Sequence, residues 1–183
     1  EAAASTGITK DNWRKKTKSN LLIRYQRVIE EQTGYKSIPD SVLADNPDKS
    51  RYMGTPDKFY LKYGISVSKQ LDAGIVMEKD AGEEYFSGSN KNGFDFYSAH
   101  LIYRNDKKFI QTIALGDYHL QFGQGLLMWS SYAGFKTGSV NQLAKRPFVV
   151  KKSFSSDENR FLRGAAITLG KAEFTCTIFG SYH

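Results

Sequence analysis

Two histidines and a nearby aspartate are the first residues whose types and spacing suggest chemistry. Asp117 and His119 lie two positions apart, so in a strand they share one face. With His100 they would offer three donor groups for a metal ion or a proton relay. The chain has only 3 His and 1 Cys, however, and no compact run of metal ligands. We therefore expect these side chains to be ordinary polar residues, and we predict no metal and no cofactor.

Other patterns associated with catalysis or ligand binding are incomplete. Gly123-Gln124-Gly125 lacks the third glycine and the following helix of a dinucleotide fingerprint. The acidic residues within 78–84 do not have the spacing of an EF-hand loop, which favours a solvated loop over a calcium site. No Gly-x-Ser-x-Gly elbow is present. We therefore predict that the protein is not an enzyme.

Basic residues exceed acidic ones, and the formal net charge is +7. Two basic groups have aromatic residues beside them. These groups are Arg14, Lys15, Lys16 and Lys18 near Trp13, and Lys145, Arg146, Lys151 and Lys152 near Phe148 and Phe154. Basic residues interleaved with aromatic ones can bind single-stranded nucleic acid. No recognised nucleic-acid motif accompanies them. Contact with solvent or lipid phosphates is therefore favoured, and nucleic acid is kept as the alternative partner.

β-Strands are the elements expected to carry these residues. Aromatic residues make up 14% of the chain, and the 16 Gly and 4 Pro also favour a β-rich fold. Alternation of apolar and other residues is clearest from Phe59 to Val67, and a tight turn at Lys69-Gln70 leads into a second alternating segment, which predicts a hairpin. A helix is the competing interpretation only for 21–29. Strands are predicted at 21–29, 59–68, 71–77, 94–104, 109–124, 161–169 and 172–182.

The connections between these strands differ in length from one side to the other. Tight turns are expected near Lys69, Asp106 and Lys171, and long polar connections at 31–56, 80–93 and 125–159. Short turns on one side and long loops on the other are typical of outer-membrane β-barrels. A soluble sandwich also alternates apolar and polar residues, so alternation alone does not separate the two folds.

Aromatic residues near strand ends favour the barrel, because aromatic girdles lie at the membrane interfaces. These residues are Phe59, Tyr103, Phe122 and Tyr182. We predict an all-β fold of antiparallel up-and-down strands, forming a transmembrane β-barrel portion at 19–183 after a polar, basic segment at 1–18. An odd number of strands would leave open edges, which lipid does not satisfy, so we expect part of a larger barrel.

In such a barrel the polar strand face lines the lumen and the apolar face meets lipid. The lumen candidates are Lys62, Ser66, Asp72, Glu78, Asp117, His119, Gln121, Glu173 and Thr175. The lipid-facing candidates are Leu61, Tyr63, Ile65, Val67, Ile75, Leu120, Phe174 and Ile178. The single cysteine, Cys176, is expected on the apolar face of its strand, opposite the face of Thr175. No run of about 18 apolar residues is present, so no transmembrane helix is expected.

Four stretches together resemble a family of large outer-membrane proteins of the Bacteroidota. They are MEKDAGEEYF at 77–86, GFDFYSAH at 93–100, GDYHLQFGQGL at 116–126 and ENRFLRGAA at 158–166. Members are usually labelled for an N-terminal helix-hairpin-helix segment that precedes a long β-rich region. The resemblance extends from about Leu21 onward. It implies a barrel-type fold and an outer-membrane address, but no catalytic residues, and nothing here matches the helix-hairpin-helix segment itself.

The sequence thus predicts an integral protein of the bacterial outer membrane with a transport, channel or assembly role. Its expected partners are outer-membrane lipid and other outer-membrane or periplasmic proteins. The alternative is a soluble β-sandwich that binds nucleic acid or another anionic polymer through basic loops, which would make the binding strongly dependent on salt.

Overall fold

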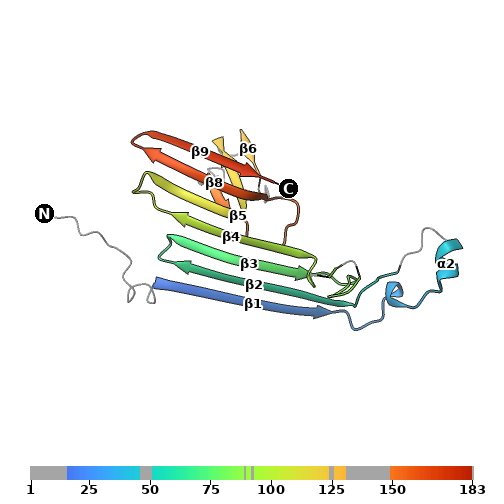
Figure 1. The fold of residues 1–183 in the computed structure, drawn as a ribbon. Coiled ribbons are helices and arrows are strands. Elements are labelled where there is room, and N and C mark those ends of the chain that lie inside the picture. Colours follow the sequence, from blue (N-terminus) through green and yellow to red (C-terminus); the bar gives the residue numbers. More distant parts are fainter. Residues whose placement is uncertain are drawn as a thin grey trace, which may run out of the picture. The chain divides into compact units, whose positions relative to one another are not determined.

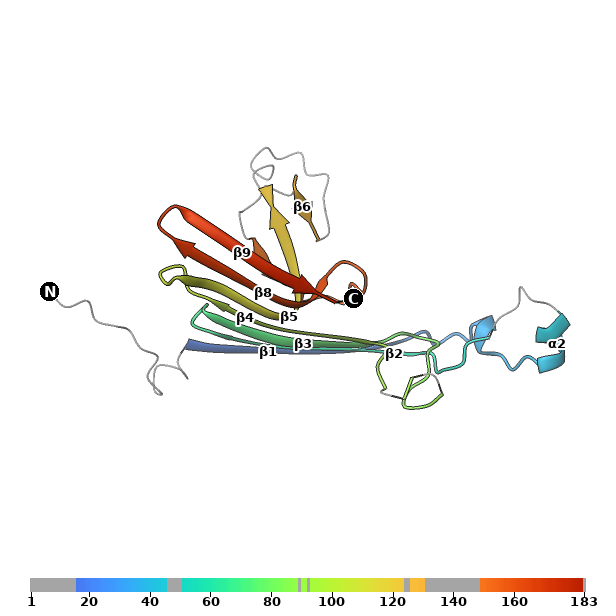
Figure 2. The ribbon, with the colours of Figure 1, turned by 45° about the horizontal axis from the view of Figure 1, so that its top comes forward.

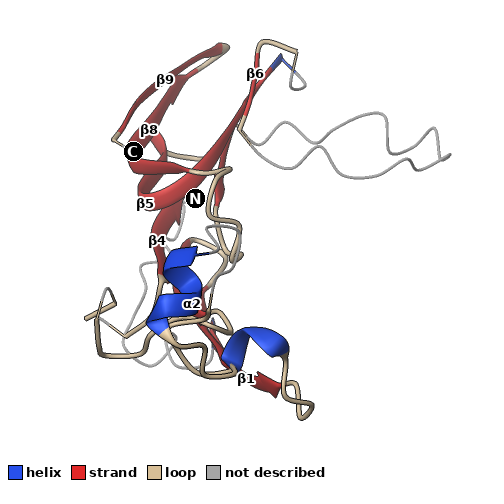
Figure 3. Ribbon diagram, turned by 90° about the vertical axis from the view of Figure 1, so that its right-hand side faces the viewer, coloured by secondary structure: helices blue, strands red, loops and turns tan. Residues whose placement is uncertain are grey.

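The computed structural model describes residues 16–45, 51–88, 90–91, 93–123, 126–130 and 149–182. Strands dominate these residues, as Figure 3 shows. The helical elements within them are the 3-10 turn η1 (Thr33–Tyr35) and the short helix α2 (Asp40–Asp45). The predicted all-β class is therefore confirmed, although the long stretch 31–56 was expected to be a loop throughout.

The strands form one antiparallel up-and-down sheet (Figure 1). They are β1 (Thr17–Arg27), β2 (Asp57–Val67), β3 (Leu71–Lys79), β4 (Phe96–Arg104), β5 (Ile110–Phe122), β6 (Met128–Trp129), β7 (Val150–Lys152), β8 (Leu162–Lys171) and β9 (Phe174–Ser181). The order along the sheet is β1-β2-β3-β4-β5-β8-β9, while β6 and β7 pair with β5 off this path. In the described part of the chain β1 and β9 end the path, so the sheet is not closed.

Two-residue turns connect β2 to β3 and β8 to β9. Ser68 and Lys69 both have positive φ, 52° and 60°, and Gln70 N donates to Val67 O at 3.0 Å. This is the type I′ geometry that matches the twist of antiparallel strands. The last turn lies at 172–173, after Lys171 pairs with Phe174, and not at 170–171 as predicted. Glu173 is therefore an exposed turn residue, which corrects its prediction as a lumen-lining strand residue.

Two strands within the predicted connection 125–159 were missed. β6 has two residues and β7 has three, and both pair with the second half of β5. Segments this short contain no complete period of alternation, so a pattern-based prediction has nothing to detect. Residues 131–148, which include basic and aromatic residues singled out above, lie outside the described part, as do residues 1–15 of the predicted 1–18 segment.

The chain has two compact units. Unit 1 comprises the described residues of Glu1–Asn20, Tyr63–Ile75 and Ser98–His183. Unit 2 comprises Leu21–Lys62 and Val76–Tyr97, again for the described residues.

In unit 1, β5 changes partners at Gly116. Its pairing with β4 runs from Arg104↔Thr112 to His100↔Gly116, and from Tyr118 onward β7 pairs with it instead. Gly116 has φ +85°, and a Cβ there would collide with the carbonyl of Ala99. The missing side chain and the positive φ let the strand turn sharply out of the main sheet, as Figure 2 shows.

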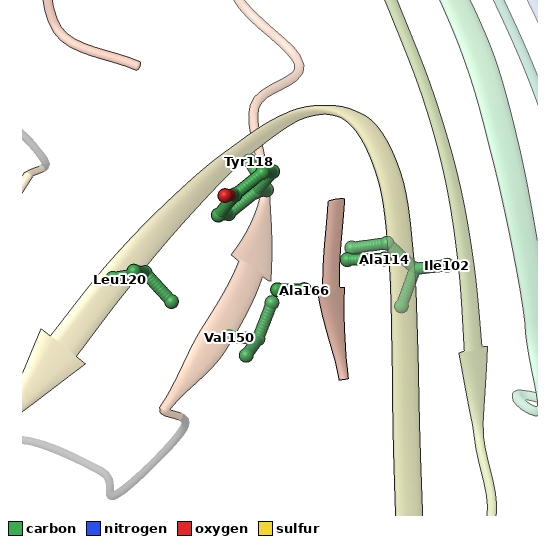
Figure 4. Close-up of a cluster of buried hydrophobic side chains, with 6 residues drawn as sticks. All are labelled: Ile102, Ala114, Tyr118, Leu120, Val150 and Ala166. Carbon is green, nitrogen blue, oxygen red and sulfur yellow. The ribbon is translucent and has the colours of Figure 1, made fainter. Parts of the chain in front are cut away.

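The bend of β5 encloses a small hydrophobic core, shown in Figure 4. The core comprises Ile102, Ala114, Tyr118, Leu120, Val150 and Ala166. Leu120 is 0% exposed there, so its prediction as a lipid-facing residue is wrong. The physical reason is that β5 leaves the flat sheet before Leu120 and pairs with β7, which covers it. Val67 is also buried, at the turn where Ser68 N donates to Lys16 O.

Candidate functional site

A strap, Val149–Phe154, crosses one face of the sheet in unit 1. Backbone hydrogen bonds fix one side of it to β5: Gln121 N donates to Val149 O at 2.9 Å, and Ser153 N donates to Asp117 O at 3.0 Å. The Arg104 guanidinium also donates to Val150 O at 3.3 Å. We call the face beneath it the strap face and the opposite one the open face.

An ion pair joins the strap to β3. Lys152 Nζ lies 2.8 Å and 2.9 Å from the two carboxylate oxygens of Asp72. His100 Nε2, on β4, lies 2.9 Å from the same carboxylate, which must accept, so Nε2 donates. One carboxylate therefore gathers donors from β4 and from the strap. Such charge-assisted hydrogen bonds are stronger than neutral ones.

Phe154 fills a recess made by two glycines. A Cβ on Gly64 would lie 2.9 Å from the ring, and one on Gly74 would lie 2.6 Å from it. The edge-on ring of His100 is 4.8 Å away, and Lys152 Nζ is 4.8 Å from the ring centroid. The absence of side chains at the two glycines is therefore what lets the far edge of the Phe154 ring approach β2 and β3.

Buried polar atoms without partners surround this cluster. Ser98 Oγ, His100 Nδ1 and Ser153 Oγ make no hydrogen bond within the described residues. A buried polar atom that loses its partner costs about 1–3 kcal/mol. Ser98 and His100 lie two apart on β4 and thus share the strap face. The strap face therefore holds buried polar groups that water would otherwise satisfy.

The open face of unit 1 carries apolar side chains that nothing in the described chain covers. Leu101 is 40% exposed, Leu115 46% and Ile178 58%. Tyr63, Leu71 and Phe174 belong to the same exposed set. Gly64, Asp72 and His100 lie on the strap face. Tyr63, Leu71 and Leu101, which precede or follow them in the strands, therefore lie on the open face, because successive side chains of a strand point to opposite sides. Exposed apolar residues in such number over neighbouring strands are unusual for a sheet surrounded by water.

Unit 2 shows an aromatic cluster of six rings, made of Tyr25, Phe59, Tyr85, Phe86, Phe94 and Tyr97. Tyr85 is its centre, with ring centroids 4.5 Å from Phe86, 5.8 Å from Phe94 and 6.0 Å from Phe59. Four of the rings belong to the exposed large apolar residues of the chain. Tyr25 and Phe59 lie near the ends of β1 and β2 that meet the long connection.

Charged side chains form a separate network in unit 2. Lys58 Nζ lies 2.9 Å from Glu78 and also contacts Asp80. Arg24 lies 4.0 Å from Glu78 and sits over the Tyr60 ring at 5.0 Å. Lys58 and Tyr60 flank Phe59 in β2, so they project from the opposite side of that strand. The network around Glu78 thus lies across β2 from Phe59, whereas Arg27 pairs with Asp57 on the side of Phe59.

The structure brings only some of the predicted lumen residues into these clusters. Asp72 and Glu78 are the centres of the two charged networks, while Lys62 and Ser66 are partly buried on β2. Asp117 is buried and pairs with Arg163 Nε at 2.7 Å, directly across the ladder from β8. His119 Nδ1 donates to the backbone carbonyl oxygen of Ser130 at 3.1 Å, and neither His119 nor Asp117 joins His100 in a metal cluster among the described residues.

Among the predicted lipid-facing residues, Tyr63, Phe174 and Ile178 are exposed. Leu61, Ile65 and Ile75 are partly buried within β2 and β3. Thr175 is exposed on β9 and Gln121 is buried on β5.

Sequence reasoning missed Lys152, Phe154 and His100 as a group. Lys152 and Phe154 were assigned to a long loop, and His100 was weighed only with Asp117 and His119. A signal does exist in the two glycines Gly64 and Gly74, which interrupt otherwise alternating strands and mark a close approach by another group.

No helix in the described residues is long and apolar enough to cross a membrane. No protein-family model, curated protein or solved structure matches this chain.

Proposed function

We propose that the chain forms part of a β-barrel that spans the bacterial outer membrane, with the open face toward lipid and the strap face toward a polar interior. The exposed apolar open face is the observation that carries this proposal. Folding in water favours removal of apolar surface by about 25 cal/mol per Å². A sheet face with exposed leucine, isoleucine and aromatic side chains is instead expected to contact the lipid hydrocarbon.

Strand lengths support the same proposal. β1 and β2 each have 11 residues, β3 and β4 have 9, and β8 has 10. A tilted strand needs about 9–11 residues to cross the hydrocarbon core. The antiparallel hairpins with two-residue turns at 68–69 and 172–173 match the short-turn side of such barrels.

The aromatic cluster of unit 2 supports a membrane interface near the ends of β1 and β2 that meet the long connection. Tyrosine and phenylalanine rings gather where a barrel meets the headgroup region, because their bodies are apolar and the tyrosine hydroxyls remain hydrated. The outer-membrane address itself rests on the resemblance of the four stretches described above.

The charged strap face supports a role for the barrel interior in the passage of a solute or the docking of a partner. In lipid, a charged side chain such as Asp72 would be costly, whereas in a water-filled lumen it is hydrated and paired. We infer a transport, channel or assembly role for this interior.

Neighbouring residues of β9 offer a matched test. Cys176 lies on the open face and Thr175 on the other side of the strand, and both are exposed in this sheet. In outer-membrane fragments that contain the full-length protein, we expect Cys176 to resist a charged, membrane-impermeant thiol reagent. A cysteine at Thr175, in a Cys176→Ser background, should react.

Extraction provides the second arm of this test. The full-length protein should stay in the membrane pellet after high-salt and carbonate washes and should dissolve only in detergent. Release by the wash, together with rapid labelling of Cys176, would contradict the membrane orientation. It would favour a soluble β-sandwich, whose basic loops would then be examined for salt-sensitive binding of nucleic acid.

A further inference from the structure

We propose that the Val149–Phe154 strap is a displaceable constriction on the polar face, held closed by the ion pair between Lys152 and Asp72. This inference rests on the proposed function, because a strap on the lumen side of a barrel narrows the aqueous interior. It goes further by naming the segment that closes the interior and the carboxylate that holds it.

The two sides of the strap are attached in different ways. On the β5 side, backbone pairing of Tyr118↔Lys152 and Leu120↔Val150 fixes the strap as a strand. Across the face, β3 holds it through the side-chain ion pair of Asp72 with Lys152. Phe154 rests in the Gly64 and Gly74 recess, where its ring packs edge-on against that of His100. The β5 side therefore acts as a hinge and the β3 side as a latch.

The latch is accessible to water. The side chains of Lys152 and Asp72 are 36% and 21% exposed, so solvent and salt compete with their attraction. Ser98 Oγ, His100 Nδ1 and Ser153 Oγ are buried without partners while the strap is docked. Displacement of the strap would hydrate these atoms, which offsets part of the loss of the latch contacts.

Opening would change the chemistry of the interior. With Lys152 and Phe154 withdrawn, the carboxylate of Asp72 and the imidazole of His100 would face water on the polar side. The strap would then control both the width of the interior and the charge that a passing solute meets, since it carries the lysine that neutralises Asp72.

A cysteine at Ser98 reports on the strap. Ser98 is 2% exposed, its hydroxyl has no partner in the described residues, and Ser98→Cys is nearly isosteric. In the full-length Cys176→Ser protein in outer-membrane fragments, the rate of modification by a charged methanethiosulfonate is measured. We expect slow modification, accelerated about fivefold by Asp72→Asn or by Lys152→Met, and by high salt in the parent.

Lys151→Met is the matched control. It removes the same charge from the neighbouring position of β7, where Lys151 Nζ lies 3.4 Å from the neutral amide oxygen of Gln121. The rate at Ser98→Cys should stay unchanged. Labelling of Thr175→Cys in each background verifies that the barrel remains assembled.

The outcomes separate the two proposals. Equal rates at Ser98→Cys in the parent, Asp72→Asn and Lys152→Met proteins, with Thr175→Cys reactive, would overturn the latch and leave the barrel orientation intact. Acceleration by Lys151→Met to the same extent would also overturn it, because the effect would then be one of net charge. If Thr175→Cys is unreactive and Cys176 is labelled, the barrel proposal itself fails.

Discussion

Tyr118 on β5 donates its hydroxyl to the carbonyl oxygen of Gly180 on β9 at 2.9 Å, although β8 lies between these two strands. The same hydroxyl lies 3.2 Å from Ala165 O on β8. Gly116 and Gly164 are directly paired at this level of the ladder, so no side chain blocks the ring. One aromatic side chain therefore ties three strands together at the bend.

Removal of this hydroxyl is expected to loosen the bend. Tyr118→Phe keeps the ring in the core and loses only the hydrogen bonds to the two carbonyls. We expect a loss of about 1 kcal/mol in the free energy of unfolding, measured by urea titration in phospholipid vesicles. Tyr182→Phe, at a residue that is 88% exposed, should have no effect. A cost at Tyr182 equal to that at Tyr118 would argue against this role of the hydroxyl.

The bend itself is expected to depend on Gly116. Gly116→Ala places a Cβ at φ +85° and against the Ala99 carbonyl, which should cost about 1–3 kcal/mol in the free energy of unfolding. Gly180→Ala is the control, because its Cβ would meet nothing within 4 Å. If both substitutions proved neutral in the same vesicle titration, β5 would not need glycine to change partners.

The open face is expected to reject charge in a membrane. Ile178→Arg, in the middle of β9, should destabilise the vesicle-inserted protein by about 2–4 kcal/mol. Arginine at Thr175 projects to the other side of the strand and should change the free energy of unfolding by less than about 0.5 kcal/mol. The reverse order of the two effects would mean that the strap face meets lipid.

The aromatic cluster is expected to act as a connected unit. Tyr85→Leu keeps an apolar side chain but removes ring contacts with Phe59, Phe86 and Phe94. Each such pair contributes about 0.5–1.5 kcal/mol beyond its buried area. We expect a loss of roughly 1–3 kcal/mol in the free energy of unfolding in vesicles. Tyr182→Leu serves as the control, and equal losses would show that the cluster adds nothing specific.

The sequence alone located the hairpins but not the residues of their turns. Alternation from Phe59 to Val67 predicts the strand and its two faces, because a slip by one residue would exchange them. The turn predicted at Lys69-Gln70 lies at Ser68-Lys69, and the one predicted at 170–171 lies at 172–173. Alternation is a local property, so a single sequence contains it. It also places Tyr63 and Ile178 on one face of their strands, but it does not tell which face is exposed.

β5 and the strap depended on contacts between distant segments. Alternation predicted that Leu120 would share a lipid-facing side, but the bend at Gly116 and the pairing with β7 placed it in a core with Val150. The meeting of Asp72 with Lys152 joins residues 80 positions apart. Neither periodicity nor composition predicts which lysine pairs with a given carboxylate, because the pairing depends on the path of the chain between the two residues.

β5 and β8 are neighbours in the sheet, although residues 123–161 separate them along the chain. The entropic cost of closing such a long connection rises only slowly with its length. The ladder Ala114↔Ala166 and Leu115↔Ala165 pairs the two strands directly, while Ala114 and Ala166 also share a buried core with Val150 of the intervening segment. A shorter connection could therefore keep the pairing of β5 with β8, but it would have to supply another apolar side chain in place of Val150.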